Sequence, residues 1–194
     1  MKYKFFIKNL IDKSLAINLI LVLSPIFFLC AILILINDPG PIIFKQIRLG
    51  YKCEKFIIYK FRTMYVQNNR LPSKTLNDDP DVFFVGYILR RLKIDELPQL
   101  FNVLMGSMSF VGPRPCLEHV VNYEVIDSYD RFEVKPGITG LSQVCGNINI
   151  EWDERFKIDA YYVRNMNFYL DLKIMAATLL VVILGERRFL KIKT

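Results

Sequence analysis

The sequence predicts an α/β fold of the monotopic membrane type, with a broken, re-entrant N-terminal helix, a small β-hairpin or sheet, and amphipathic helices at the membrane interface. Three observations predict it: residues 14–37 carry no charged side chain, segments of strand-like alternation follow, and helical segments close the chain. The 194 residues suffice for one ordinary domain. A hydrophobic content of 53% excludes a disordered or fibrous chain, and a net charge of +7 suits an anionic membrane surface.

The N-terminal apolar run favours a membrane protein over a soluble basic protein with a large core. As a helix, residues 14–37 would reach about 36 Å, against a hydrocarbon core about 30 Å thick. Ser24 and Pro25 lie near the middle of the run. Proline removes a backbone hydrogen bond and bends a helix, and the serine hydroxyl can satisfy the freed carbonyl. We therefore expect the helix to break at this pair.

Basic residues flank the apolar run on both sides, and the positive-inside rule therefore places both ends in the cytoplasm. A re-entrant helix satisfies this arrangement; a bent full span and a buried core helix are the alternatives. No small-x-small cleavage site follows, so a cleaved signal peptide is not expected. The predicted domains are a membrane helix over residues 1–37 and a cytoplasmic domain over 38–194. The flanking residues are Lys2, Lys4, Lys8 and Lys13 before the run, and Lys45, Arg48, Lys52 and Lys55 after it.

After a turn cluster at residues 37–41, alternation and helical periodicity predict the remaining elements. The apolar stretch 174–184 is too short to span a bilayer and favours a core or interfacial helix. The expected elements are hairpin strands over 42–50 and 55–62, a polar loop over 66–81, a short helix over 95–104 with Asp95 at its cap, Pro98 in its first turn and Gly106 after its end, an irregular stretch over 107–146, and helices over 151–164 and 168–184.

The cysteines and the histidine do not predict a metal or disulfide framework. The chain has four cysteines and one histidine, His119, and no C-x-x-C pair. A structural zinc site needs about four nitrogen or sulfur ligands at close spacing. This usage fits a reducing compartment.

The acidic pair Asp95-Glu96 is the first candidate for chemistry. Arg90, Arg91 and Lys93 come just before it. Adjacent acids beside cations suit a bound metal–phosphate group, because one carboxylate can attack phosphorus while the other holds Mg²⁺. The structural alternative is that Asp95 only caps a helix.

Basic side chains at two further places are candidates for phosphate binding. Lys60 and Arg62 alternate along the end of the second strand, so both can point one way. Arg114 lies between two prolines, and such a rigid loop suits bidentate phosphate binding. The turn at residues 136–140 could bring backbone close to a ligand. The alternatives are a solvated strand edge and plain turns.

Asp159 is a candidate because it interrupts an apolar helix face. Trp152, Phe156, Asp159 and Val163 share that face by spacing. A carboxylate within an apolar stripe needs a partner, so Asp159 belongs either to a binding site or to a structural pair with Arg155 or another buried cation.

Four motifs, taken in order, resemble the bacterial sugar transferase family, the monotopic phosphoglycosyl transferases, over about residues 8–185. They are KFRTM, RR-x-KIDELPQLFNVLMGSMSFVGPRP, KPGITGLSQV and W-x-x-RF-x-x-D-x-YYV. The resemblance implies transfer of a phospho-sugar from a UDP-sugar to undecaprenyl phosphate, with Mg²⁺ and release of UMP, as the first membrane step of bacterial surface glycan assembly. It implies the cytoplasmic face of the inner membrane, contact with membrane lipid and no nucleic acid. It leaves a homodimer open.

The resemblance also implies residue roles. Asp95 matches the nucleophile that takes the phospho-sugar as an acyl phosphate, Glu96 matches its partner, and both match ligands of Mg²⁺. The attacking carboxylate must be ionised, and Mg²⁺ with nearby arginines is expected to keep the pKa of Asp95 low. Ser24-Pro25 matches the pair that breaks the re-entrant helix. The positions that match substrate- or phosphate-binding residues are Lys60, Arg62, Arg90, Arg114 and Asp159.

Departures from the family pattern support one alternative function. Ser107 stands where aspartate is usual, and Asn147 where arginine is common. The alternative is therefore a catalytically silent member that acts as a membrane scaffold for other glycan enzymes. The intact Asp95-Glu96 pair argues against it. A third reading is a glycosyl transferase that moves sugar without phosphate and releases UDP.

Overall fold

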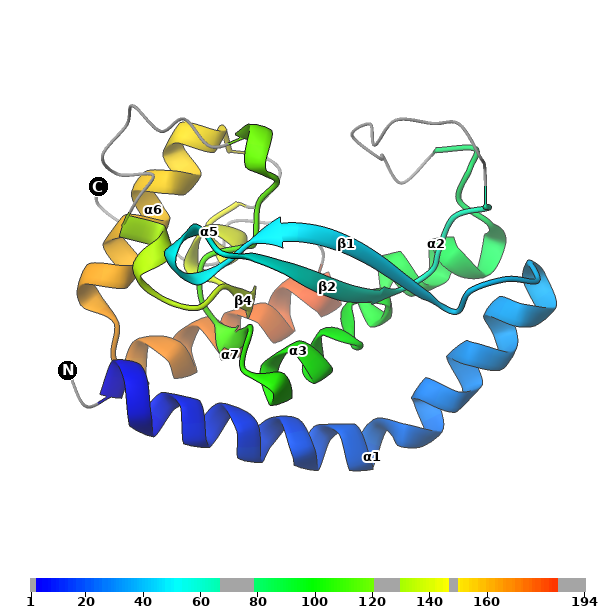
Figure 1. Cartoon of the computed structure of the whole chain (residues 1–194), viewed down its shortest axis with the longest axis horizontal. Helices are drawn as coiled ribbons and strands as arrows, with labels where there is room; N and C mark the ends of the chain where they lie inside the picture. Colours follow the sequence, from blue (N-terminus) through cyan, green and yellow to red (C-terminus); the bar gives the residue numbers. More distant parts are fainter. Residues whose placement is uncertain (1–2, 67–78, 121–129, 147–149, 185–194) are drawn as a thin grey trace.

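The long helix α1 (Lys8–Asn37) runs along one side of the molecule, and helix α3 (Gln99–Met105) separates it from a two-stranded hairpin (Figure 1). The computed structural model describes residues 3–66, 79–120, 130–146 and 150–184. The remaining helices and a second, smaller sheet pack beside α3 (Figure 1). The result is the expected mixed α/β architecture with one apolar N-terminal helix.

Helix α1 follows a π-helical turn (Tyr3–Ile7) and bends without ending at Ser24-Pro25. Figure 1 shows the curve near its middle. Pro25 cannot donate to the carbonyl of Leu21, and the Ser24 hydroxyl donates to that same oxygen at 2.8 Å. The expected break is therefore a bend, because the serine replaces the hydrogen bond that the proline removes. The re-entrant path stays a prediction.

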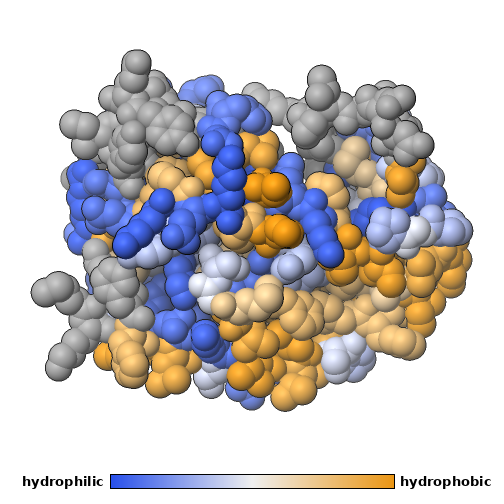
Figure 2. Space-filling view, in the orientation of Figure 1, coloured by the Kyte–Doolittle hydropathy of each residue, from blue (hydrophilic) through white to orange (hydrophobic). Residues whose placement is uncertain are grey.

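Most of α1 is open to its surroundings. In the described part of the chain it is the one helix long and apolar enough to cross a membrane, and only 11% of its most apolar window is buried. Leu21, Val22 and Phe28 are each about 70% exposed. The core-helix alternative is therefore wrong. Figure 2 shows hydrophobic side chains gathered along the side where α1 and α2 (Phe84–Arg91) lie.

The predicted hairpin is confirmed. Strands β1 (Ile43–Leu49) and β2 (Lys55–Phe61) pair antiparallel, with Phe44 opposite Lys60 and Arg48 opposite Phe56. A 3₁₀ turn, η2 (Tyr51–Cys53), joins them after Gly50. Alternation therefore places Arg48 and Lys60 on the same face of the hairpin.

The segment after the hairpin contains two short helical pieces where one helix was expected. The acidic pair lies in a 3₁₀ turn, η3 (Ile94–Glu96), and α3 begins only after Pro98. Asp95 makes no cap hydrogen bond, so the capping interpretation is wrong. The left-handed Lys93 (φ 57°) before the turn and the proline after it separate η3 from both neighbouring helices. Gly106 ends α3 in a left-handed conformation (φ 89°), as expected.

The stretch expected to be irregular contains a second sheet. Strands β3 (Ser109–Val111) and β4 (Gly137–Thr139) pair in parallel, and helix α5 (Leu141–Val144) follows. A Cβ on Gly137 would lie 2.1 Å from the backbone nitrogen of Gly112, so this close crossing requires glycine. Three-residue strands carry no detectable period, which is why the sequence did not predict them. The described part of this stretch also has 3₁₀ turns η4 (Glu118–Val120) and η5 (Arg131–Glu133); Asn147 lies outside the described residues.

The two C-terminal helices are confirmed as α6 (Trp152–Asn165) and α7 (Phe168–Leu184). Their inner faces join α3, β3 and β4 in the main apolar core, to which α1 contributes Ala16. The described parts of the predicted loop over 66–81 are Val66 and residues 79–81.

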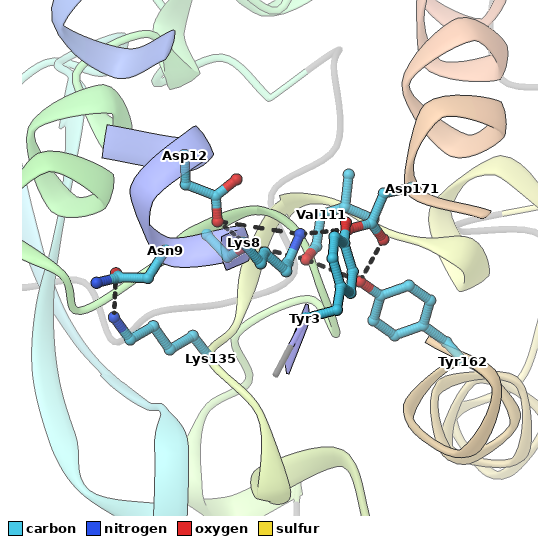
Figure 3. Close-up of polar contacts among 9 residues, drawn as sticks. Tyr3, Lys8, Asn9, Asp12, Val111, Lys135, Tyr162 and Asp171 are labelled. Atoms are coloured by element: carbon cyan, nitrogen blue, oxygen red, sulfur yellow. Dashed lines mark hydrogen bonds and ion pairs between the residues drawn. The ribbon is translucent and has the colours of Figure 1, made fainter. Parts of the chain in front are cut away.

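A buried polar network ties α1 to the rest of the core (Figure 3). Lys8 Nζ lies 2.6 Å from Asp171 Oδ2, and the Tyr162 hydroxyl donates to Asp171 Oδ1 at 2.7 Å. One turn along α1, the Ser109 hydroxyl donates to Asp12 Oδ2 at 2.6 Å. All five residues are buried. The start of α1 is therefore held by charged and hydrogen-bonded contacts with α6, α7 and β3.

Candidate active site

The acidic pair lies where η3 meets the end of β2. Glu96 Oε1 accepts two charged donors: Lys60 Nζ at 2.6 Å from β2, and Arg114 Nη2 at 3.0 Å from the loop after β3. Three segments that are distant in sequence therefore converge on one carboxylate. The structure brings these three predicted site residues together.

The Glu96 carboxylate is held in its ionised form. Burial alone would raise its pKa, but Arg114 and Lys60 outweigh that effect and lower the pKa far below the ordinary value. Its side chain is only 13% exposed, so these two charge-assisted hydrogen bonds are little screened by solvent. Glu96 thus acts as a fixed negative charge that orders two cations.

The neighbouring Asp95 is in a different environment. It is 9% exposed, and none of the described residues donates a hydrogen bond to its carboxylate. Burial and the charge of Glu96 raise its pKa, and Lys60, Lys93 and Arg90 oppose the shift only in part. Burial and the adjacent carboxylate therefore outweigh the protein's own cations, and the expectation that Mg²⁺ together with the arginines keeps the pKa of Asp95 low stays a prediction. The pair thus combines an ionised Glu96, whose charge is balanced by Lys60 and Arg114, with an Asp95 that has no such ion pair among the described residues.

Arg90 lies at the end of α2, and Arg62 lies just after β2. Arg90 Nε donates to Thr63 Oγ1 at 2.8 Å, and its charge acts on Asp95. Arg62 is 5% exposed and forms an ion pair with Asp38, just after α1. Among the described residues, Arg62 makes no ion pair with Asp95 or Glu96. Its substrate-binding role, like that of Arg90, stays a prediction.

Asp159 lies in the interior. Its Oδ2 is 3.3 Å from Arg131 Nη2, and both side chains are 2% exposed. The predicted apolar face of α6 is confirmed, since Phe156 and Val163 are buried beside it. Within the described residues Asp159 forms no ion pair with Lys60 or another predicted phosphate ligand. Its direct substrate contact stays a prediction.

Sequence reasoning assigned Arg48 to the membrane flank and missed its place near the site. Its Nε and Nη2 donate to Gln46 Oε1 at 3.1 and 2.6 Å, and it pairs with no carboxylate among the described residues. Burial and the nearby Arg114 lower the pKa of Arg48, and the charge of Glu96 opposes this shift only in part. The hairpin register, which puts Arg48 and Lys60 on one face, is the signal that could have found it.

The two acids are suitable Mg²⁺ ligands. Mg²⁺ prefers oxygen donors and is commonly held by one or two carboxylates together with substrate phosphates. Asp95 accepts no hydrogen bond from the described residues, and only one oxygen of Glu96 is used by Lys60 and Arg114. No group of three or more His, Cys, Asp or Glu gathers in the described part of the chain. The pair fits an incomplete metal site that substrate phosphates would finish.

Comparison with known proteins agrees with this site. The sequence model of the family described as "Bacterial sugar transferase" matches residues 3–185. A protein of Bacillus subtilis named "Uncharacterized sugar transferase EpsL" is 39% identical over 180 residues, which cover 93% of this chain and 89% of that protein.

Two further relatives carry more specific names. The UDP-glucose:undecaprenyl-phosphate glucose-1-phosphate transferase of Escherichia coli is 38% identical over 89% of this chain and 39% of its own length. The UDP-N-acetylgalactosamine-undecaprenyl-phosphate N-acetylgalactosaminephosphotransferase of Aeromonas hydrophila is 38% identical over 93% of this chain and 44% of its own length. The chain thus spans less than half of these two relatives. The family model covers residues 3–185, and EpsL matches 93% of this chain at 39% identity. The chain therefore belongs to the bacterial sugar transferase family.

Proposed function

We propose that the chain transfers a phospho-sugar from a UDP-sugar to undecaprenyl phosphate and releases UMP, through a covalent intermediate on Asp95. The observation that carries the proposal is the unequal acidic pair: Glu96 is neutralised by Lys60 and Arg114, whereas the Asp95 carboxylate accepts no hydrogen bond from the described residues. An unpartnered carboxylate beside fixed cations suits nucleophilic attack on a phosphate. The relatives named as undecaprenyl-phosphate sugar phosphotransferases support the same reaction.

In the first step, an Asp95 carboxylate oxygen attacks the phosphorus that bears the sugar. The bond from that phosphorus to the bridging oxygen breaks, and UMP leaves with the electron pair. Lys60, Arg114 and Arg48 supply positive charge where the leaving phosphate gains negative charge. The product is an acyl phosphate that joins Asp95 to the phospho-sugar.

In the second step, an oxygen of undecaprenyl phosphate attacks the same phosphorus. The bond to Asp95 breaks, the carboxylate is restored, and the sugar is left on an undecaprenyl diphosphate. Two steps suit a single small site, because the nucleotide leaves before the lipid phosphate arrives. Asp95 and Glu96 would hold Mg²⁺, which when bound neutralises charge on the diphosphate.

We place this reaction at the cytoplasmic face of the bacterial inner membrane, where α1 would enter and leave by one side. The exposed apolar side chains of α1 support contact with lipid. An acceptor whose phosphate lies at the headgroup level would then meet a site held at the same depth.

The test is nucleotide release by the full chain in nanodiscs, with Mg²⁺, undecaprenyl phosphate and a panel of UDP-sugars that includes UDP-glucose and UDP-N-acetylgalactosamine. UMP and UDP are measured separately. We expect UMP from at least one donor, with formation of the lipid-linked product. UDP instead of UMP would mean glycosyl transfer, and neither nucleotide from any donor would favour the silent scaffold.

Replacing Pro25 with Leu tests the path of α1. Leucine restores the backbone donor to the Leu21 carbonyl, so the helix is expected to straighten and the N-terminus to move across the bilayer. Accessibility labelling of a cysteine introduced near the N-terminus of a chain otherwise without cysteine would detect the change of side. An N-terminus that stays cytoplasmic in Pro25→Leu would contradict the role given to this proline.

A further inference from the structure

The strongest unexplained feature is the buried ion pair between Asp159 on α6 and Arg131 in η5. Both side chains are 2% exposed, and Asp159 Oδ2 faces Arg131 Nη2 at 3.3 Å. One atom of each partner, Arg131 Nη1 and Asp159 Oδ1, has no hydrogen-bond partner among the described residues. Since a buried ion pair with unsatisfied atoms contributes little net stability, it requires another explanation.

Arg131 is held rigidly in one orientation. Its guanidinium lies over the ring of Phe156 at 4.7 Å and over that of Phe132 at 5.5 Å. The carboxylate of Asp159 fixes the edge of the guanidinium that carries Nη2. A planar group that is stacked and paired in this way presents its remaining donors in fixed directions.

The Arg131 guanidinium reaches the loop after β3, which carries Arg114. Arg131 Nη2, the nitrogen that faces Asp159, also donates to the backbone carbonyl of Arg114. Arg114 in turn places its side chain 3.0 Å from Glu96. A continuous chain of contacts thus runs from Asp159 on α6, through Arg131, to the backbone of the residue that neutralises Glu96.

We propose that Asp159 and Arg131 are positioning residues, which hold the Arg114 backbone so that the Arg114 side chain meets Glu96 and the substrate diphosphate. This inference rests on the proposed function and gives Asp159 a role other than the substrate contact expected from the sequence. Small displacements of a catalytic group can lower the rate by about 100-fold.

The central experiment is a double-mutant cycle between Asp159→Asn and Arg114→Ala, with UMP release as the measurement. Asp159→Asn is expected to lower kcat/KM by about 100-fold in the otherwise unchanged chain. In the Arg114→Ala background the same substitution is expected to change kcat/KM by less than about threefold, because the group it positions is absent. Losses that multiply in the double variant would overturn the proposal, since a merely structural role acts whether or not Arg114 is present.

Two further variants guard against misfolding and non-specific effects. Arg131→Lys keeps the charge opposite Asp159 but loses the planar fork, so it is expected to lower kcat/KM similarly to Asp159→Asn. Asp130→Asn is the matched control, because Asp130 adjoins Arg131 but pairs with the Arg164 side chain, which is 60% exposed. We expect Asp130→Asn to change kcat/KM by less than about twofold. A control loss as large as that of Asp159→Asn would also contradict the proposal.

A readout that does not need activity separates this inference from the proposed function. Cys116 is fully buried two residues after Arg114, and the other cysteines, at 30, 53 and 145, can be replaced by alanine. Release of the Arg114 backbone in Asp159→Asn is expected to raise the rate of Cys116 labelling by maleimide at least about tenfold, while the emission of Trp152, the single tryptophan, stays native-like. An unchanged labelling rate would overturn the positioning role even if the chain released no UMP, whereas absent UMP with faster labelling would count against the proposed reaction alone.

Discussion

Asp95→Asn is expected to lower UMP release by at least about 10³-fold, which is the scale seen when a nucleophile is removed from an enzyme. The amide is nearly isosteric with the carboxylate but cannot attack phosphorus as an anion. Because none of the described residues donates a hydrogen bond to the Asp95 carboxylate, the substitution breaks none within them and folding should be little affected. UMP release under saturating donor and lipid measures the effect.

The same variant tests the covalent intermediate directly. Incubated with donor and Mg²⁺ but without lipid, the unchanged chain should gain the mass of one phospho-sugar, and Asp95→Asn should gain none. Trp152 emission and the thermal unfolding midpoint serve as the folding control. Residual turnover near the level of the unchanged chain, or a mass gain that persists without the carboxylate, would show that another residue is the nucleophile.

Asp171→Asn is expected to lower the free energy of unfolding by about 3 kcal/mol, because it removes the nearer of the two carboxylates paired with the buried Lys8 and leaves only Asp12, whose Oδ2 is 3.9 Å from Lys8 Nζ. Both side chains of that pair are below 10% exposed, and the tyrosine hydroxyls that contact Asp171 cannot neutralise an ammonium group. Denaturant unfolding in detergent, followed by Trp152 emission, measures the loss.

The matched control is Glu118→Gln. Glu118 Oε2 lies 2.8 Å from Lys55 Nζ, nearly the distance of the buried pair, but both side chains are 59% exposed. An exposed pair of this kind contributes at most about 1 kcal/mol. Equal losses in the two variants would mean that burial of the Lys8–Asp171 pair has no special effect on stability.

The elements that the sequence predicted are those in which the spacing of apolar and polar residues agrees with their burial in the fold. Alternation of Lys60, Phe61 and Arg62 in the second of two strand-like segments around Gly50 predicted the hairpin, and the spacing of Phe156 and Val163 predicted the buried face of α6. Lys60 and Arg114 were predicted as phosphate-binding residues, from strand alternation, a proline-fixed loop and the family motifs. The structure places both on Glu96, and their contact with phosphate stays a prediction.

The remaining features depend on contacts between distant segments. The pairing of Ser109 with Gly137 joins two three-residue strands whose sequences have no period of their own. The link from Asp159 to Arg131 needs α6 to lie against η5. Of the two partners that the sequence left open for Asp159, the structure has the other buried cation, Arg131, whereas Arg155 lies over the ring of Trp152. The pKa values of Asp95 and Glu96 are shifted in opposite directions by burial and by two cations from other segments. The identity of two adjacent acidic residues does not reveal this difference.

The few buried residues of α1 bear on how the protein is made. Ala16 and Ile34 are 0% exposed and belong to apolar clusters that also contain Val103 and Phe61, from α3 and β2. The helix that would face lipid is thus also part of the interior of the domain. Removing the first 37 residues should therefore open both clusters to water instead of yielding a soluble enzyme. During biosynthesis, the insertion of this helix and the folding of the segments that follow it must be completed together.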